Sequence, residues 1–102
     1  MAKVYVVNNG GHDYSDAERF GEIVFCTDAF IRRDDTGLMY RALHEALKDA
    51  EPEDYLMMSS LTSMCVVASG ILVEKFGSLN MLILHNQQYT ARKVVFCNEA
   101  HA

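Results

Sequence analysis

Two residues near the start of the chain have side chains suited to proton transfer. His12 and Asp13 are adjacent, and an imidazole beside a carboxylate can act as a general acid and base. Asp28 is a further candidate for this role or for binding a metal. Adjacent side chains need not point the same way, however, and Asp13 also suits the position before a short helix. No group of His, Cys, Asp and Glu has the spacing of a metal motif, so we predict no metal and no cofactor.

Two other segments suit contacts between the backbone and a phosphate group. Asn8-Asn9-Gly10-Gly11 contains two glycines, which permit backbone angles that other residues resist. Its spacing is not G-x-G-x-x-G, so a dinucleotide fingerprint is absent, and a simple tight turn is the alternative. Ser59, Ser60, Thr62 and Ser63 surround the start of an expected helix. Their hydroxyls can cap that helix, and the same helix N-terminus can bind an anion.

Arg32 and Arg33 are the remaining candidates for contacting phosphate. They precede Asp34 and Asp35, so the alternative is a surface loop whose charges pair with one another.

The charge balance argues against binding to a nucleic-acid polymer. The chain has 9 Lys and Arg against 14 Asp and Glu in 102 residues, a formal net charge of −5. A duplex-binding surface needs clustered basic residues, and the only adjacent basic pairs are Arg32-Arg33 and Arg92-Lys93. A pocket for a small anion remains compatible with this charge.

The cysteines and the apolar segments favour a cytoplasmic protein. Cys26, Cys65 and Cys97 are far apart and odd in number, which is typical of reduced core cysteines. Met64–Val73, the longest apolar stretch, is about half the length of a membrane span. Lys3 is followed by too short an apolar run for a signal peptide. We expect neither membrane anchoring nor export.

Short apolar segments separated by turns predict five strands. Four segments are near-continuous apolar runs, which is typical of strands buried on both faces. The short connection His85–Gln88 predicts that the last strand pairs antiparallel in a hairpin, at the sheet edge. The expected strands are Val4–Val7, Glu22–Thr27, Tyr55–Met58, Leu79–Leu84 and Tyr89–Phe96.

Three helices are expected between the first four strands. Ser15 and Glu18 form a capping-box pattern that predicts a short helix over 16–20, ended by Gly21. An apolar stripe with helical spacing covers 38–50, and Pro52 follows it. The third helix starts with Thr62 or Ser63 as its cap and ends at Gly77. It is apolar nearly all round, which indicates burial or contact with another subunit.

The order β-α-β-α-β-α-β-β indicates an α/β fold. We predict a small Rossmann-like three-layer sandwich, with a mostly parallel sheet and a C-terminal antiparallel hairpin strand. Residues 1–97 form one α/β domain in this prediction, and 98–102 form a flexible tail.

Ligands of parallel sheets bind beyond the carboxyl ends of the strands. Most of the polar candidates follow those ends, whereas the opposite end offers mainly turns. The predicted ligand-binding residues are Asn8, Gly10, Gly11, His12, Asp13, Asp28, Arg32, Arg33, Ser59, Ser60 and Thr62.

The segment GHDYSDAERFGEIVF resembles the start of short bacteriophage-encoded α/β proteins, a group with no established activity. The resemblance extends through DYLMMSS to the final hairpin. It implies a phage protein acting in the cytoplasm of an infected bacterium, and it carries over no catalytic residues.

Three functions follow from these observations. The first is a binding module for a nucleotide or another phosphorylated small molecule, in a phage setting a host signalling nucleotide. The second is a protein–protein interaction or structural protein without a ligand. The third is a small nucleotide-processing enzyme, in which His12, Asp13 or Asp28 acts. A homo-oligomer, formed through the apolar helix or the fifth strand, fits all three.

Overall fold

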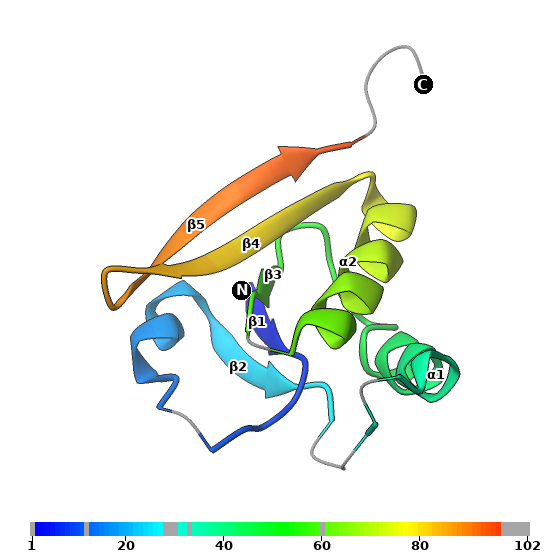
Figure 1. The fold of residues 1–102 in the computed structure, drawn as a ribbon. Coiled ribbons are helices and arrows are strands. Elements are labelled where there is room, and N and C mark those ends of the chain that lie inside the picture. Colours follow the sequence, from blue (N-terminus) through cyan, green and yellow to red (C-terminus); the bar gives the residue numbers. More distant parts are fainter. Residues whose placement is uncertain (1, 12, 28–30, 33, 60, 97–102) are drawn as a thin grey trace.

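The computed structural model describes residues 2–11, 13–27, 31–32, 34–59 and 61–96. Its strands are β1 (Lys3–Val6), β2 (Glu22–Phe25), β3 (Tyr55–Met57), β4 (Ser78–His85) and β5 (Gln88–Val95) (Figure 1). Its helices are the short 3-10 helix η1 (Ser15–Phe20), α1 (Thr36–Ala46) and α2 (Thr62–Phe76).

All five strands belong to one sheet, in the order β2-β1-β3-β4-β5. The first four are parallel, and β5 pairs antiparallel with β4. Asn86 and Gln87 form the hairpin turn with φ of 51° and 64°. Positive φ values at both central residues are typical of a type I′ turn, which suits the right-handed twist of the two strands. The α/β class, the mostly parallel sheet and the antiparallel hairpin strand are therefore confirmed.

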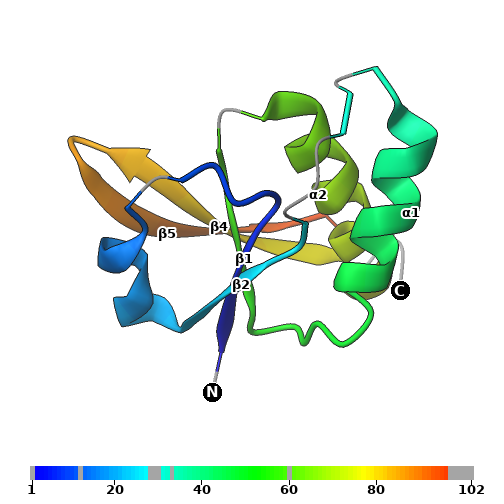
Figure 2. The same ribbon diagram turned by 90° about the horizontal axis from the view of Figure 1, so that it is seen from below.

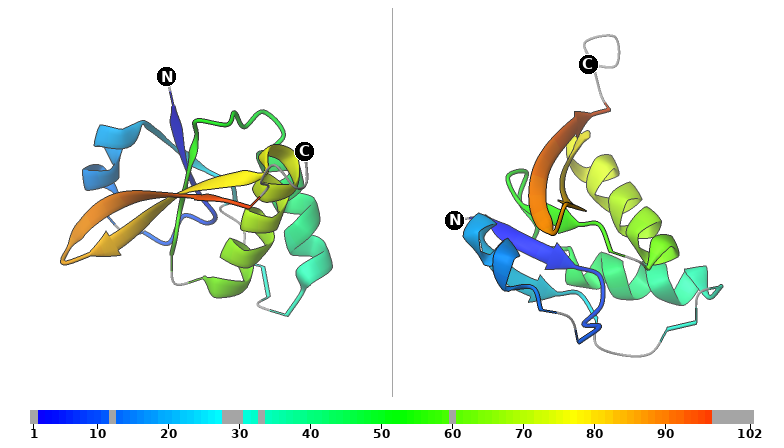
Figure 3. Two further views of the ribbon diagram at one scale, coloured as in Figure 1. Left: turned by 90° about the horizontal axis from the view of Figure 1, so that it is seen from above. Right: turned by 60° about the vertical axis from the view of Figure 1, so that its left-hand side comes forward.

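The helices lie on two faces of the sheet. α1 and α2 pack over a core that includes Tyr5, Leu43 and Leu56, whereas Ala17 of η1 packs with Val4 and Leu82 on the other face. Figure 2 shows η1 on one side of β1 and β2 and the two α-helices on the other. Figure 3 shows the long β4–β5 hairpin extending past the short strands on the η1 side. Within the described residues, neither α-helix is long and apolar enough to span a membrane.

This arrangement has a direct consequence for where ligands can bind. The chain moves from β1 to β2 in one direction across the sheet, then passes β1 again to reach β3. With right-handed crossovers, that reversal places the connecting helices on opposite faces. In such sheets, ligands usually bind at the carboxyl ends of the two strands on either side of this reversal, which are β1 and β3 here.

The helix starts differ from the prediction. The capping box at Ser15 was wrong: Tyr14 is the N-cap of η1 and makes no side-chain cap bond. Asp13 Oδ1 instead accepts from the Ser15 N–H at 2.9 Å, because an Asp side chain readily bonds to the backbone two residues on. Thr62 and Ser63 were also wrong as caps of α2. They lie inside the helix, and Leu61 is the N-cap.

Gly21 ends η1 in a conformation that only glycine adopts readily. Its φ of 157° and ψ of 178° lie in a region essentially restricted to glycine. A Cβ at this position would also collide with the carbonyl oxygen of Ala2. Gly21 therefore allows the chain to turn directly from η1 into β2.

Candidate functional site

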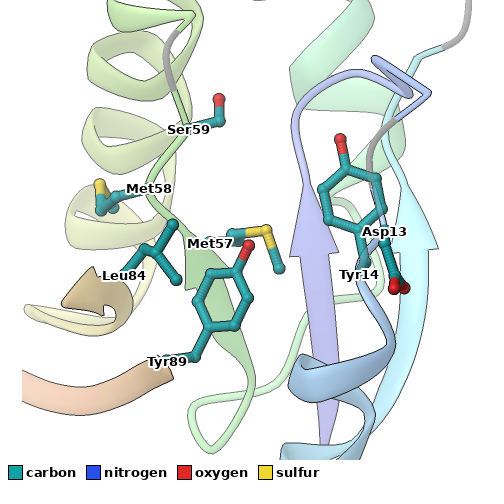
Figure 4. A pocket seen from close by; sticks show the side chains of 7 residues that line it. All are labelled: Asp13, Tyr14, Met57, Met58, Ser59, Leu84 and Tyr89. Atoms are coloured by element: carbon teal, nitrogen blue, oxygen red, sulfur yellow. The ribbon is translucent and has the colours of Figure 1, made fainter. Parts of the chain in front are cut away.

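A pocket of about 380 Å³ lies at the carboxyl end of β3, on the η1 side of the sheet. This volume falls within the range of about 300–1,000 Å³ found for small-molecule sites. Figure 4 shows the seven side chains that line it: Asp13, Tyr14, Met57, Met58, Ser59, Leu84 and Tyr89.

Strand pairing positions one wall of the pocket. Leu84 and Tyr89 are directly opposite each other across the β4–β5 hairpin. Tyr89 packs with the buried Met57 in the core under η1, so its ring lies on the inner side of the curled sheet. Side chains directly opposite in an antiparallel pair are close enough to touch. The two-residue turn therefore determines which aromatic residue reaches the pocket.

Tyr14 forms the facing wall. Its ring packs edge-on against Phe25 of β2, with ring centroids 5.4 Å apart. The Gly10 N–H donates to its hydroxyl at 3.4 Å, which ties the loop after β1 to the pocket. In Figure 4, Tyr14 and Tyr89 stand on two sides of Met57. Two aromatic rings and a polarisable thioether form a suitable enclosure for a flat, unsaturated ring.

Two of the ionisable groups that line the pocket, Asp13 and Tyr89, have shifted pKa values. Burial raises the pKa of Tyr89, with smaller effects from Tyr14, Asp16 and Asp13, so its phenol stays protonated and can donate. Hydrogen bonds from Ser15 lower the pKa of Asp13, so its carboxylate stays ionised. Figure 4 shows that carboxylate on the far side of Tyr14 from Met57. The negative charge is therefore at the rim, away from the two rings.

Ser59 connects the pocket to the start of α2. Its Oγ accepts from the Leu61 N–H at 3.3 Å, and its N–H donates to Cys65 Sγ at 3.4 Å. The N-cap Leu61 has no polar side chain to offer to the first turn of the helix. Backbone donors at a helix N-terminus favour an anion, and Ser59 is the pocket residue that bonds to the N-cap residue of α2.

The structure brings together only part of the predicted ligand set. Asp13 and Ser59 both line the pocket, and Gly10 touches it through Tyr14. Asn8 lies half-buried after β1, and Gly11 has a φ of 77° within the turn that follows. Thr62 is exposed at the first position of α2. His12, Asp28, Arg33 and Ser60 lie outside the described residues.

Arg32 does not line the pocket. Its guanidinium pairs with Asp34 at 2.9 Å, and both side chains are more than two-thirds exposed. The alternative of a self-paired surface loop therefore describes Arg32 as the structure has it.

The apolar and aromatic residues of the pocket were not among the predicted ligand-binding residues. Those were mostly polar residues that follow the strands, whereas the larger part of the wall comes from Tyr14, Met57, Met58, Leu84 and Tyr89. One sequence pattern did indicate two of these residues, Leu84 and Tyr89. A two-residue turn at Asn86 and Gln87 pairs Leu84 with Tyr89, and strand alternation then puts both on one face.

A second hollow, of about 340 Å³, lies between α1 and α2 and has a structural explanation. The Lys75 ammonium group lies there and donates to the carbonyl oxygens of Leu47, Lys48 and Ala50 at 3.4, 2.8 and 3.2 Å. These carbonyls follow the end of α1, where a cation is stabilising. The ammonium group of Lys75 therefore caps the C-terminal end of α1. Among the described residues, no three His, Cys, Asp or Glu side chains are grouped as metal ligands.

Cys26 is expected to be unreactive in the folded protein. Burial, together with the nearby Cys65, raises the pKa of its thiol from 9.0 to about 12, which lowers the thiolate fraction at pH 8 about a thousandfold. Iodoacetamide followed by peptide mass mapping should leave Cys26 unmodified at pH 8 and should alkylate it in urea. Equal alkylation rates in the two conditions would contradict this burial.

The free energy of unfolding should also fall as the pH rises from 9 toward 12, because the Cys26 thiol ionises at a lower pH in the unfolded chain than in the folded one.

The chain was compared with known protein families, curated proteins and solved structures. Residues 2–97 match the model of one family, described as Phage Pam3 gp32-like protein. No curated protein and no solved structure matches the chain. The family match agrees with the expected resemblance to proteins encoded by bacteriophages, and it covers nearly the whole chain. The chain therefore belongs to the Phage Pam3 gp32-like family.

Proposed function

We propose that this protein binds a small phosphorylated molecule, a nucleotide or a close chemical relative, at the carboxyl end of its sheet. The observation that carries the proposal is the pocket itself. It combines Tyr14 and Tyr89 with the buried Met57, and it includes Ser59, which bonds to the N-cap residue of α2. A mostly apolar pocket with a few polar groups is the usual form of a small-molecule site.

Each part of such a ligand has a matching part of the pocket. A planar base fits between the two tyrosine rings, where stacking on aromatic side chains is favourable. Its phosphate lies toward Ser59 and the N-terminal turn of α2, where backbone N–H groups attract an anion. The ionised Asp13 is turned outward at the rim, and it is the one carboxylate among the described residues that line the pocket. The proposal includes the Rossmann-like arrangement, in which phosphates bind where a strand leads into a helix.

Binding without turnover is the form of this function that we favour. Among the ionisable side chains that line the pocket, Asp13 has a lowered pKa and Tyr89 a raised one, so both values move away from neutrality. A general acid or base works best with a pKa near the working pH. For a member of a phage family, sequestering a host nucleotide in the bacterial cytoplasm is the role that fits this chemistry.

A thermal-shift screen against mono-, di- and cyclic nucleotides tests the proposal, with the parent nucleosides and inorganic phosphate as controls. At about 100 times the dissociation constant, a ligand adds roughly 2.7 kcal/mol of stability. For a domain of this size, that gain raises the melting temperature by roughly 10–20 °C. We expect a nucleotide to exceed both its nucleoside and phosphate. A screen with no stabilising nucleotide would contradict the proposal and favour an interaction protein.

A further inference from the structure

The outer edge of β5 alternates between backbone groups that face β4 and groups that face away. Gln88 closes the hairpin opposite His85, and the Phe96 N–H donates to the Gly77 carbonyl at 2.9 Å, so even-numbered residues face β4. Odd-numbered residues therefore direct both their N–H and their C=O outward. Tyr89, Lys93 and Val95 are among these outward residues.

The first part of this edge is already occupied. The Tyr89 N–H donates to Asp16 Oδ2 at 3.1 Å, and its carbonyl accepts from the Arg19 guanidinium at 2.6 Å. Asp16 and Arg19 also pair with each other at 3.6 Å. Side chains of η1 thus take the place of a neighbouring strand at this end of β5.

The second part of the edge is open. In the part of the chain that the structure describes, the outward groups of Lys93 and Val95 make no recorded hydrogen bond. The apolar side chains around them are unusually accessible, with exposed fractions of 36% at Val94, 64% at Val95 and 55% at Phe96. Unpaired backbone groups beside exposed apolar side chains form a template for another strand.

We propose that a second copy of this chain pairs antiparallel with the open half of β5, about a two-fold axis at Val94. In this register, Lys93 of each copy lies opposite Val95 of the other. Both residues are outward-facing, so each such pair exchanges two backbone hydrogen bonds. The two sheets become one continuous sheet, and the interface is the same patch on both copies.

Side-chain chemistry favours this register over the one centred on Lys93. Val94 meets Val94 of the second copy, and Arg92 lies opposite the exposed ring of Phe96, where a guanidinium is attracted to an aromatic face. An axis at Lys93 would instead place Lys93 against Lys93, and like charges directly opposite are destabilising. The register centred on Val94 thus separates the basic residues and joins the apolar ones.

The dimer leaves the candidate pocket accessible. Tyr89 precedes Val95 by six residues, which corresponds to about 20 Å along a strand. The two pockets therefore lie at the outer ends of the joined sheet. Dimer formation is independent of the proposed ligand and is tested without one.

The first test is the solution mass of the full chain, measured by light scattering at low and high protein concentration. The mass should rise toward twice the 11.5 kDa monomer. Val95→Pro should give a monomer at every concentration, because it removes an outward N–H and leaves the bonds to β4 intact. Val66→Asp, at another exposed valine on α2, is the matched control and should still dimerise. A wild-type monomer at high concentration, or a dimeric Val95→Pro, would overturn the proposal.

A charge exchange tests the register. Val94→Asp and Val94→Lys should each be monomeric, since each sets like charges against one another at the axis. Mixing the two should restore a dimer containing one copy of each, visible by native mass spectrometry. Two monomers that stay apart on mixing, with native circular dichroism, would overturn the register. If either variant fails to fold, Lys93→Pro replaces it, and a dimer of that variant would equally overturn the pairing.

Discussion

Replacing Asp54 with alanine is expected to lower the free energy of unfolding by about 3 kcal/mol. Asp54 is the one polar residue among those buried in the described chain, with 8% of its surface exposed. Its Oδ1 accepts from the Lys3 N–H and its Oδ2 from the Glu51 N–H, both at 2.8 Å. These bonds join the start of β1 to the turn before β3. Alanine would leave both donors without this acceptor in a partly buried place.

Urea unfolding measures this effect. Asp49→Ala is the matched control: its side chain is exposed, and its loss should change stability by no more than about 0.5 kcal/mol. Asp54→Asn should lie between the two, because it keeps one acceptor oxygen and sets an NH₂ group against the second donor. An Asp54→Ala protein as stable as Asp49→Ala would show that these two hydrogen bonds do not hold the strands together.

Replacing Tyr89 with alanine is expected to weaken nucleotide binding roughly 5- to 150-fold. Stacking of a base on an aromatic side chain contributes about 1–3 kcal/mol, and Tyr89 supplies one of the two rings in the pocket. Tyr89→Phe keeps the ring and loses only the hydroxyl group, which burial keeps protonated. It should therefore bind the nucleotide within a few-fold of the wild-type affinity. Calorimetric titration with the nucleotide that stabilises the protein most measures the three dissociation constants.

Tyr40→Ala provides the control for this series. Tyr40 is a half-exposed tyrosine on α1, on the opposite face of the sheet from the pocket. Its substitution should leave nucleotide affinity unchanged. Equal losses in Tyr40→Ala and Tyr89→Ala would mean that the decrease comes from general destabilisation and not from the pocket.

The sequence was most informative where local chemistry and burial act together. The near-continuous apolar runs predicted the first four strands, and the short connection after them predicted the fifth. Gly77 ends α2 in the left-handed conformation that favours glycine. Helix starts were less predictable, because side chains that precede the expected cap residues bond to the backbone there. Asp13 takes the Ser15 N–H, and Ser59 takes the Leu61 N–H, although the hydroxyls of Ser15 and Thr62 have the right types to cap.

The candidate site was predictable in position and only partly in composition. Asp13 and Ser59 could be found because the carboxyl ends of parallel strands meet at one edge. Tyr14 and Tyr89 come together only through long-range packing, since β5 curls toward η1 and its edge bonds to Asp16 and Arg19. Such contacts join residues seventy or more positions apart, and no local sequence pattern predicts them. The pairing of Arg32 with Asp34, by contrast, is local and was one of the two alternatives considered.

The central claim, that a nucleotide binds between Tyr14 and Tyr89 at the carboxyl end of the sheet, is tested most directly by amide chemical-shift mapping during a nucleotide titration. We expect the largest shifts at Asp13, Tyr14, Met58, Ser59, Leu84 and Tyr89, and at the first residues of α2. Resonances around Lys75, in the hollow between α1 and α2, should stay in place. Shifts confined to that hollow, or a spectrum unchanged by every nucleotide, would contradict the proposed site.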